Sequence, residues 1–235
     1  SVCGGKHSMF MTKSESQDTT ESYDEVLPTV SLDGDIAIIK LPDFLVTAED
    51  FLGTAEAGQK YAKVAEDFIH ENRDKIKGVV LDLRGNIGGD MGPMATAVSS
   101  LLPDGELVYY HYRSYDIPVT LKNGVVSNAG TGGRSLYPEE KLNVPVAILT
   151  DDMTASSGEA LTLCFRGLEN TRTFGAPTAG YTSVNMLYNM YDGAQMYLTV
   201  AFDKARTGEI FKETPIEPDV ATDSPLEAAI EWLRG

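Results

Sequence analysis

Residues 144–168 constrain the fold most strongly, because a buried strand gives way there to a helix within a few residues. The apolar run at 144–149 is typical of a strand buried on both faces. A polar turn follows, and a helical pattern begins at Ala160. Ser156 and Ser157 therefore lie at a helix start, where backbone N–H groups lack helical partners and carry partial positive charge.

Two interpretations of this turn stay open on the segment alone. Ser156-Ser157-Gly158-Glu159 matches the S-x-x-E pattern of a capping box, in which serine and glutamate satisfy the first N–H groups of a helix. The same position suits a nucleophilic serine, because the intermediate of acyl transfer carries an oxyanion that such N–H groups stabilise. The rest of the chain has to decide between a cap and a nucleophile.

A second strand, turn and helix precede this segment. Residues 78–83 form another buried apolar run, the glycine-rich sequence RGNIGGDMG follows, and Pro93 opens a helical pattern. The glycine-rich sequence fits neither a P-loop nor G-x-G-x-x-G. Its glycines can present backbone N–H groups to an anion, although a plain tight turn explains them equally well.

The remaining sequence alternates between strand and helix patterns. The expected elements are a hairpin at 29–41, a long helix at 48–75, β-ribbons at 107–121 and 185–202, and a terminal helix at 225–233. Residues 11–26 are polar and acidic, which predicts a loop. This order of elements predicts an α/β fold with additional β-ribbons.

Composition excludes several function classes. The chain has 235 residues, enough for a sizeable core, and its net charge of −16 argues against a nucleic-acid partner. It contains no apolar run long enough to predict a membrane-spanning helix, and no signal peptide is visible. Because the sequence begins at Ser1 without methionine, we expect that an upstream segment is missing.

Histidines and cysteines do not form a metal-binding pattern. Cys3 and Cys164 are far apart, and neither HxH nor HExxH occurs, so we expect no metal and no cofactor. His70 lies on a polar helical stretch, which favours a surface role, and His111 lies in a tyrosine-rich ribbon, which favours packing. His7 follows a Gly-Gly-Lys loop, where a general base or a structural histidine is equally consistent with the sequence.

Several motifs, taken together and in order, resemble a known family. VVLDLRGNIGGDM resembles the LDLRxNxGG signature of the C-terminal-processing and tricorn-like serine peptidases. TASSGEALTLCFRGL resembles their nucleophile segment, and GGKHS, FGAPTAGYTS and IEPDV resemble three further motifs. The matches extend from residue 7 to residue 220. The resemblance implies a ClpP/crotonase-like spiral core of β-β-α units.

Carried over to this sequence, the resemblance assigns a nucleophile and an oxyanion hole. Ser156 stands three residues before Glu159, as the nucleophile does in the family. The backbone N–H of Ser157 then supplies one oxyanion donor. Gly88 or Gly89 of the glycine-rich turn supplies the other.

The base distinguishes the two branches of the family. In the processing peptidases a lysine follows the serine by twenty-five residues, but this chain has Tyr181 at that position. The tricorn-like branch uses a histidine instead, which implies His7 as the general base. Glu213 is the better match for the glutamate of that branch. In the tricorn-like branch a serine precedes the catalytic histidine. In this chain Lys6 precedes His7 and Ser8 follows it, so the residue that takes the place of that serine is left open.

The resemblance implies a serine endopeptidase that cleaves peptides or proteins through an acyl-enzyme. We expect an N-terminal segment with the histidine and the acidic loop at 1–30, and one catalytic domain at 31–235. The family also implies a location outside the cytoplasm of a bacterium. A non-catalytic peptide- or ligand-binding member of the same fold is the alternative. An acyl-CoA enzyme is less consistent, because no basic site for nucleotide phosphates is evident. The substrate and the oligomeric state stay open.

Overall fold

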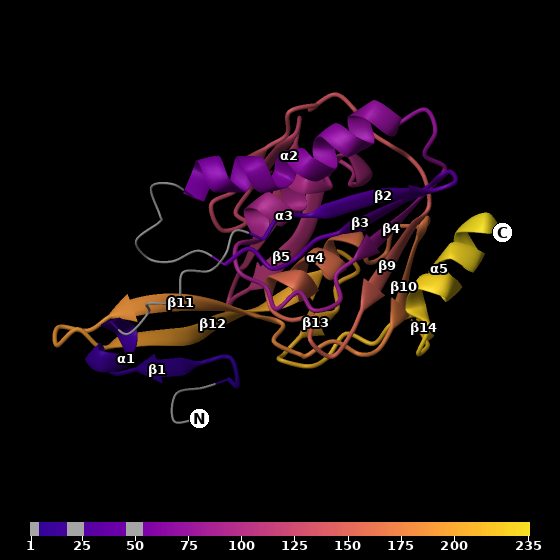
Figure 1. Ribbon diagram of the computed structural model, residues 1–235. Coiled ribbons are helices and arrows are strands. Elements are labelled where there is room, and N and C mark those ends of the chain that lie inside the picture. The colour runs from indigo at the N-terminus through magenta and orange to yellow at the C-terminus, as the bar shows by residue number, and fades with distance from the viewer. Residues whose placement is uncertain (1–4, 18–25, 46–53) are drawn as a thin grey trace.

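The computed structural model describes residues 5–17, 26–45 and 54–235, which form a mixed α/β structure with two sheets (Figure 1). The larger helices are α2 (Thr54–Asn72), α3 (Met91–Ala97), α4 (Ser157–Phe165) and α5 (Pro225–Arg234). Among these described residues, no helix combines the length and apolar character needed to cross a membrane. The helices and the two sheets confirm the predicted α/β class with β-ribbons.

A six-stranded sheet forms the centre of the molecule. In spatial order its strands are β14 (Val220–Ala221), β10 (Thr171–Gly175), β9 (Val146–Thr150), β4 (Gly78–Asp82), β3 (Ile36–Lys40) and β2 (Thr29–Asp33). All neighbours are parallel except β2 and β3, which form the predicted hairpin. Every residue of β4 and β9 is buried, because both faces of the sheet are covered.

Helices cover the central sheet on both faces. On one face, α5 packs against β4, β9 and β10, and the small cluster there includes Leu149, Phe174 and Ala229. The other face carries the main core, to which α2, α3 and α4 contribute. Cys164 of α4 is a free, fully buried cysteine in that core, as the apolar helical pattern predicted. Cys3 lies outside the described residues.

The second sheet is antiparallel and carries the N-terminal segment. Its strands are β1 (Met9–Met11), β5 (Gly105–His111), β6 (Asp116–Lys122), β7 (Val125–Ser127), β8 (Gly133–Arg134), β11 (Ser183–Asn189), β12 (Gln195–Ala205) and β13 (Ile210–Phe211). Strands β11 and β12 form a hairpin that projects from the body, and β1 lies along β12 (Figure 1). Pairing of β1 with β12 therefore brings the N-terminal segment beside the chain around residue 200.

Part of the predicted N-terminal loop is ordered instead. Residues 13–17 form a short helix, α1 (Lys13–Gln17), in place of the loop expected from the polar composition. The reason is a local cap: Glu15 Oε2 accepts the Thr12 N–H at 2.7 Å, and Thr12 Oγ1 accepts the Glu15 N–H at 3.4 Å. This is the reciprocal pattern of a capping box. Residues 18–25 and the start of the predicted helix at 48–53 lie outside the described residues.

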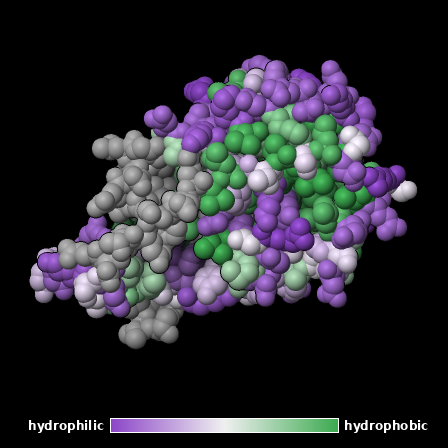
Figure 2. Space-filling model, viewed as in Figure 1, coloured by the Kyte–Doolittle hydropathy of each residue, from purple (hydrophilic) through white to green (hydrophobic). Residues whose placement is uncertain are grey.

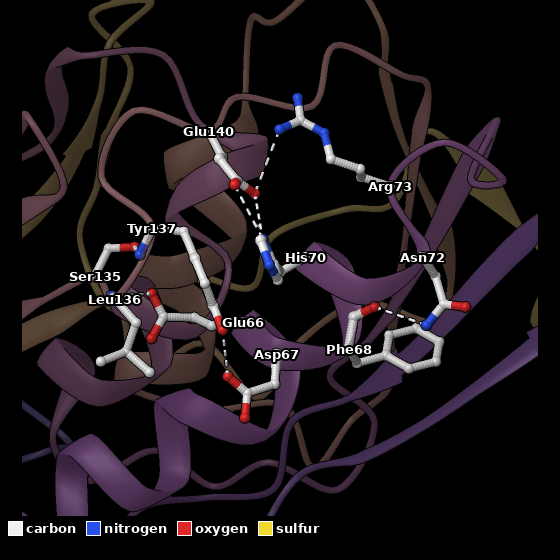
Figure 3. A network of polar contacts seen from close by, with 10 residues as sticks. All are labelled: Glu66, Asp67, Phe68, His70, Asn72, Arg73, Ser135, Leu136, Tyr137 and Glu140. Carbon is white, nitrogen blue, oxygen red and sulfur yellow. Dashed lines mark hydrogen bonds and ion pairs between the residues drawn. The ribbon is translucent and has the colours of Figure 1, made fainter.

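A polar network ties α2 to residues 135–140 (Figure 3). His70 Nδ1 lies 2.9 Å from a carboxylate oxygen of Glu140, and the imidazole stacks on Tyr137 with 4.0 Å between ring centroids. The Tyr137 hydroxyl donates to Asp67 at 2.9 Å. Hydrophilic side chains also cover the outer edge formed by α2 (Figure 2). His70 lies at the surface, as its polar helical stretch predicted. His111 packs within its ribbon, where its Nδ1 lies 2.6 Å from Asp116 on the neighbouring strand.

Candidate active site

The two strand–turn–helix units meet at one edge of the central sheet. Strands β4 and β9 are parallel neighbours, with Leu81 opposite Ile148, so the turns that follow them leave the sheet at the same edge. Gly88 shows how close these turns come: a Cβ atom on it would lie 2.8 Å from Ser156 Cβ. Its φ of 111° also requires glycine. The glycine-rich turn therefore packs directly against the serine turn.

Ser156 occupies a strained backbone conformation between β9 and α4. Its φ is 51° and its ψ is −117°, a combination that L-residues rarely adopt. Such strain costs roughly 1–3 kcal/mol and persists only where the surrounding structure enforces it. A sharp, strained turn between a strand and a helix is the geometry that presents a nucleophilic serine above a sheet.

Glu159 holds this turn in place from within the core. Its Oε2 accepts the backbone N–H of Ser156 at 2.9 Å and that of Tyr181 at 2.7 Å. Its Oε1 accepts the Gly180 N–H at 2.8 Å and a short bond from the Thr178 hydroxyl. Burial raises the pKa of this carboxyl group, and the four hydrogen bonds oppose that rise. A helix cap and a cavity-lining serine are therefore compatible at this position, because Glu159 caps the Ser156 N–H from within the core.

Two backbone N–H groups beside Ser156 have no hydrogen-bond partner among residues 5–17, 26–45 and 54–235. They belong to Ser157 and Gly89, and both residues line the same cavity as Ser156. The Gly88 N–H, in contrast, donates to Asn86 Oδ1 at 2.9 Å. Of the two glycines that the sequence offered, Gly89 is thus the one whose N–H is available to a ligand.

His7 reaches this site through the N-terminal strand pairing. Asn185 of β11 donates to the His7 carbonyl at 2.8 Å, and the imidazole packs edge-on against Tyr181 with 5.2 Å between centroids. The His7 Nδ1 lies 3.1 Å from Ser183 Oγ. Burial lowers the pKa of His7 below its usual 6.5, while a hydrogen bond to the Ser183 backbone and the charge of Glu213 act in the opposite direction. The imidazole is therefore held by one nitrogen and is neutral near pH 7.

Glu213 contacts the backbone of the histidine loop and not the imidazole. Its carboxylate accepts the N–H of Lys6 at 2.7 Å and of His7 at 3.2 Å. It also accepts the Ser183 hydroxyl at 3.3 Å. The backbone bonds to Lys6 and His7 help to lower the pKa of Glu213 against the raising effect of burial. Glu213 therefore reaches the imidazole through Ser183.

Ser183 was not among the residues predicted from the sequence. It is a buried serine at the first position of β11, two residues after Tyr181, and a polar residue at a buried strand position was its available signal. The serine that the sequence did offer, Ser8, does not contact the imidazole and instead bonds Thr199, whose Oγ1 donates to Glu213 Oε1 at 3.1 Å. The Ser8 hydroxyl donates to Thr199 Oγ1 at 3.3 Å and accepts the Thr199 N–H at 3.1 Å.

Ser156 and His7 lie between two cavities. One, of about 380 Å³, is lined by both residues together with Gly89, Ser157 and Ser183. The other, of about 310 Å³, is lined by both residues together with Ile87, Met153 and Tyr181. A chain passing from one cavity to the other would therefore cross the serine and the histidine. The described residues contain no group of three or more His, Cys, Asp or Glu side chains suited to a metal ion.

A strained serine at a helix start and a histidine that lines the same cavity are features of serine hydrolases. Residues 35–222 match the family model described as peptidase family S41. The chain belongs to this family and is a serine-type peptidase. The family predicted from the sequence motifs is thus confirmed.

Two curated relatives are similar to this chain. The chain is 37% identical over 234 residues to the nisin-resistance protein of Lactococcus lactis, a match that spans 99% of this chain and 70% of the relative. It is 29% identical over 173 residues to the carboxy-terminal processing protease CtpA of Bacillus subtilis, spanning 73% of this chain but 34% of that protein.

Solved structures agree with these relatives. A lipoprotein from Streptococcus agalactiae shares 31% identity and superposes with a TM-score of 0.79, covering 98% of this chain and 77% of the other. The tricorn protease superposes with a TM-score of 0.52 over 86% of this chain and 18% of its own, at 18% identity. The second likeness concerns the fold alone.

Proposed function

We propose that this protein is a serine endopeptidase that hydrolyses peptide bonds through an acyl-enzyme on Ser156, with His7 as the general base. The observation that supports this most directly is the shared cavity of the two residues. The His7 Nδ1 is engaged by Ser183, which leaves Nε2 as the nitrogen that can accept a proton from Ser156.

In the acylation step, Ser156 Oγ attacks the carbonyl carbon of the scissile peptide bond while its proton moves to Nε2 of His7. The carbonyl oxygen becomes an oxyanion. When the carbon–nitrogen bond breaks, the histidine returns the proton to the leaving amine. The acyl group stays on the serine as an ester, and the amine product departs.

Deacylation repeats the sequence with water as the nucleophile. His7 takes one proton from the water, whose oxygen attacks the ester carbonyl, and then returns that proton to Ser156 Oγ. The acid product leaves and the free serine is restored. Because no other reactant enters, the two steps together consume one water for each peptide bond.

The oxyanion hole is proposed to consist of the N–H groups of Ser157 and Gly89. Both flank Ser156 on the cavity, and neither has a hydrogen-bond partner within the described part of the chain. Loss of one such donor in other enzymes costs about 2.7–4 kcal/mol of transition-state stabilisation. Gly88 is proposed to serve a different purpose, namely the close packing of the two turns.

Ser183 and Glu213 are proposed to position the base. With its hydrogen on Nδ1, His7 donates to Ser183 Oγ, and the Ser183 hydroxyl donates to Glu213. This polarity keeps Nε2 unprotonated, and the carboxylate stabilises the imidazolium that forms. The late glutamate expected from the family therefore acts through a serine, and Ser183 takes the place that neither Lys6 nor Ser8 fills.

The finer features of fold and location also remain proposals. These are the spiral core of β-β-α units, the segment 1–30 with one catalytic domain at 31–235, and a site of action outside the cytoplasm. The bacterial relatives and the lipoprotein match support that location.

The nisin-resistance relative supports a peptide as the substrate. A binding protein that has lost catalysis is the second candidate, but a histidine that lines the same cavity as a strained serine favours an enzyme.

Labelling with a fluorophosphonate probe tests the proposal. We expect covalent labelling of the native chain, and none of Ser156→Ala or His7→Ala. Ser157→Ala should still be labelled, because the proposal uses the backbone N–H of Ser157 and not its hydroxyl. This variant therefore distinguishes the two adjacent serines. Labelling that persists in Ser156→Ala would exclude Ser156 as the nucleophile, and a native chain that stays unlabelled would favour the binding protein.

A further inference from the structure

The cavity beside Ser156 contains a carboxylate that the proposed mechanism does not use. Asp203 lies on β12, where alternate residues Ala201, Asp203 and Ala205 face inward and are buried. The side chain of Asp203 is therefore placed where a strand of this pattern normally carries an apolar residue. The two small alanines on either side leave space around it.

Asp203 is buried, and its carboxylate has no partner within the part of the chain that the structure describes. The residue is 2% exposed, and no hydrogen bond or ion pair to its carboxylate exists among residues 5–17, 26–45 and 54–235. Its backbone is satisfied, since the N–H donates to the Thr182 carbonyl at 3.1 Å. Glu159, the other buried carboxylate near the site, accepts four hydrogen bonds instead. A buried carboxylate that serves packing alone would be expected to have such partners.

The carboxylate lies at the deep end of the catalytic cavity. Asp203 lines the cavity of about 380 Å³ that Ser156 and His7 also line. Two further lining residues, Met91 and Ala160, are 2% and 4% exposed, whereas Leu187 is 40% exposed and marks the rim. The cavity thus has largely apolar walls and a carboxylate at its inner end, and its volume is sufficient for a long side chain.

Within the described part of the chain, no cation bonds to the Asp203 carboxylate, and the partly buried Arg206 donates instead to the Cys164 carbonyl at 2.6 Å. Burial, together with the nearby Glu159, raises the pKa of Asp203 to about 8. The other titratable groups that face it are Tyr110 of β5 and Cys164 of α4, and His7 borders the same cavity. Tyr110 and Cys164 have raised pKa values, and His7 is neutral near pH 7. A cation entering the cavity would therefore ionise Asp203 and form the ion pair that the protein itself does not provide.

We infer that Asp203 determines specificity by accepting a basic side chain, that of lysine or arginine, from the peptide residue next to the scissile bond. The methylene part of such a side chain fits the apolar walls, and its charged end reaches the carboxylate. The net charge of −16 favours the approach of cationic peptides. This inference rests on the proposed peptidase function.

The test measures binding to the Ser156→Ala chain, in which cleavage cannot interfere. Peptides whose single charged group is one lysine are compared by calorimetry with the same peptides carrying norleucine in its place, which lacks the charge. We expect the lysine peptides to bind at least roughly tenfold more tightly, as a charge-assisted hydrogen bond requires. Adding Asp203→Asn should abolish this preference. Adding Asp223→Asn, an exposed residue with the same change in charge, should leave it intact.

Protonation supplies a readout that a merely structural role would not affect. If the entering lysine ionises Asp203, binding releases a proton, and the apparent enthalpy differs between buffers of different ionisation enthalpy. The lysine preference should also increase from about pH 6 to about pH 9, because less of the binding energy is spent on deprotonation. This series needs no substitution at residue 203. A preference independent of pH, or one that survives Asp203→Asn, would overturn the inference.

Failure of this inference and failure of the peptidase proposal give different results. Fluorophosphonate labelling of Ser156 in both the native chain and Asp203→Asn, with equal binding of lysine and norleucine peptides, contradicts the specificity role alone. Lysine-selective binding by a native chain that the probe does not label contradicts the peptidase proposal and retains the cation site.

Discussion

His7 meets Glu213 through its main chain, and Ser183 connects the two side chains. The His7 N–H lies 3.2 Å from Glu213 Oε1, whereas its Nδ1 lies 3.1 Å from Ser183 Oγ. Ser183 Oγ is in turn 3.3 Å from the same carboxylate oxygen. Ser183 of β11 therefore determines how the Glu213 carboxylate influences the His7 imidazole.

Ser183→Ala should lower kcat about ten- to a hundredfold with little change in KM, because the imidazole loses its orienting partner but not its place in the cavity. Steady-state kinetics with a peptide substrate measure this split. Ser183→Thr, which keeps the hydroxyl, should recover part of the loss. Ser8→Ala is the comparison variant, since the Ser8 hydroxyl reaches Glu213 through Thr199 but does not contact the imidazole. Equal losses of kcat for Ser8→Ala and Ser183→Ala would contradict the positioning role of Ser183 between His7 and Glu213.

Gly5→Ala should disturb Glu213. A Cβ atom at residue 5 would lie 1.9 Å from Glu213 Oε1, so the carboxylate has to move away from the backbone of Lys6 and His7. Such overpacking costs about 1–3 kcal/mol, and kcat/KM should fall with it. Thermal unfolding and kinetics together measure the effect. Glu213→Asp, one methylene shorter, should restore activity in the Gly5→Ala background, and no recovery would mean that the clash is relieved elsewhere.

The acid limb of the pH profile of kcat/KM should lie below pH 6.5. His7 has a lowered pKa because it is buried, so it stays neutral and able to accept a proton at pH values where an exposed histidine is already charged. The same lowered pKa makes the stability of the fold depend on pH. The unfolded state binds the proton more readily, so His7 reduces the stability of the fold only as the pH falls below 6.5. An acid limb above 6.5 would assign the base to another group.

Glu159→Gln should destabilise the protein by about 2–4 kcal/mol, because an amide cannot accept every bond that the carboxylate does. The backbone N–H groups of Ser156, Gly180 and Tyr181 compete for the single remaining oxygen. Urea unfolding measures the loss. Glu169→Gln, at an exposed position after α4, should change stability by less than about 0.5 kcal/mol. A small effect at Glu159 would show that the turn does not depend on this carboxylate.

Asp203→Asn should stabilise the free protein more at pH 8 than at pH 5. The raised pKa means that the folded state holds a proton on Asp203 between about pH 4 and pH 8 while the unfolded state does not. Native stability therefore declines as the pH rises through this window, and asparagine removes that decline. The difference in Tm between the variant and the native chain, followed across this range, measures it. A constant difference would mean that Asp203 is ionised throughout.

The sequence was sufficient for the elements whose signals are local. The apolar runs at 78–83 and 144–149 predict the buried strands β4 and β9, and the motifs around them identified the family. Local composition was misleading at residues 13–17, where a capping box outweighs the polar, loop-like character of the segment. Ser183 and Asp203 escaped prediction because a serine or an aspartate in a strand-like segment carries no sign of which long-range neighbours it will meet.

What the sequence determined by itself is the pair of strand–turn–helix units, the serine and the absence of the family's lysine at position 181. These depend on short-range periodicity, turn chemistry and motif spacing. The tertiary structure decided which N–H groups are available, that Ser183 stands between His7 and Glu213, and that Asp203 faces the cavity. The reason is physical: His7 and Ser183 are 176 positions apart, and only the pairing of β1 and β11 with β12 brings them to 3.1 Å.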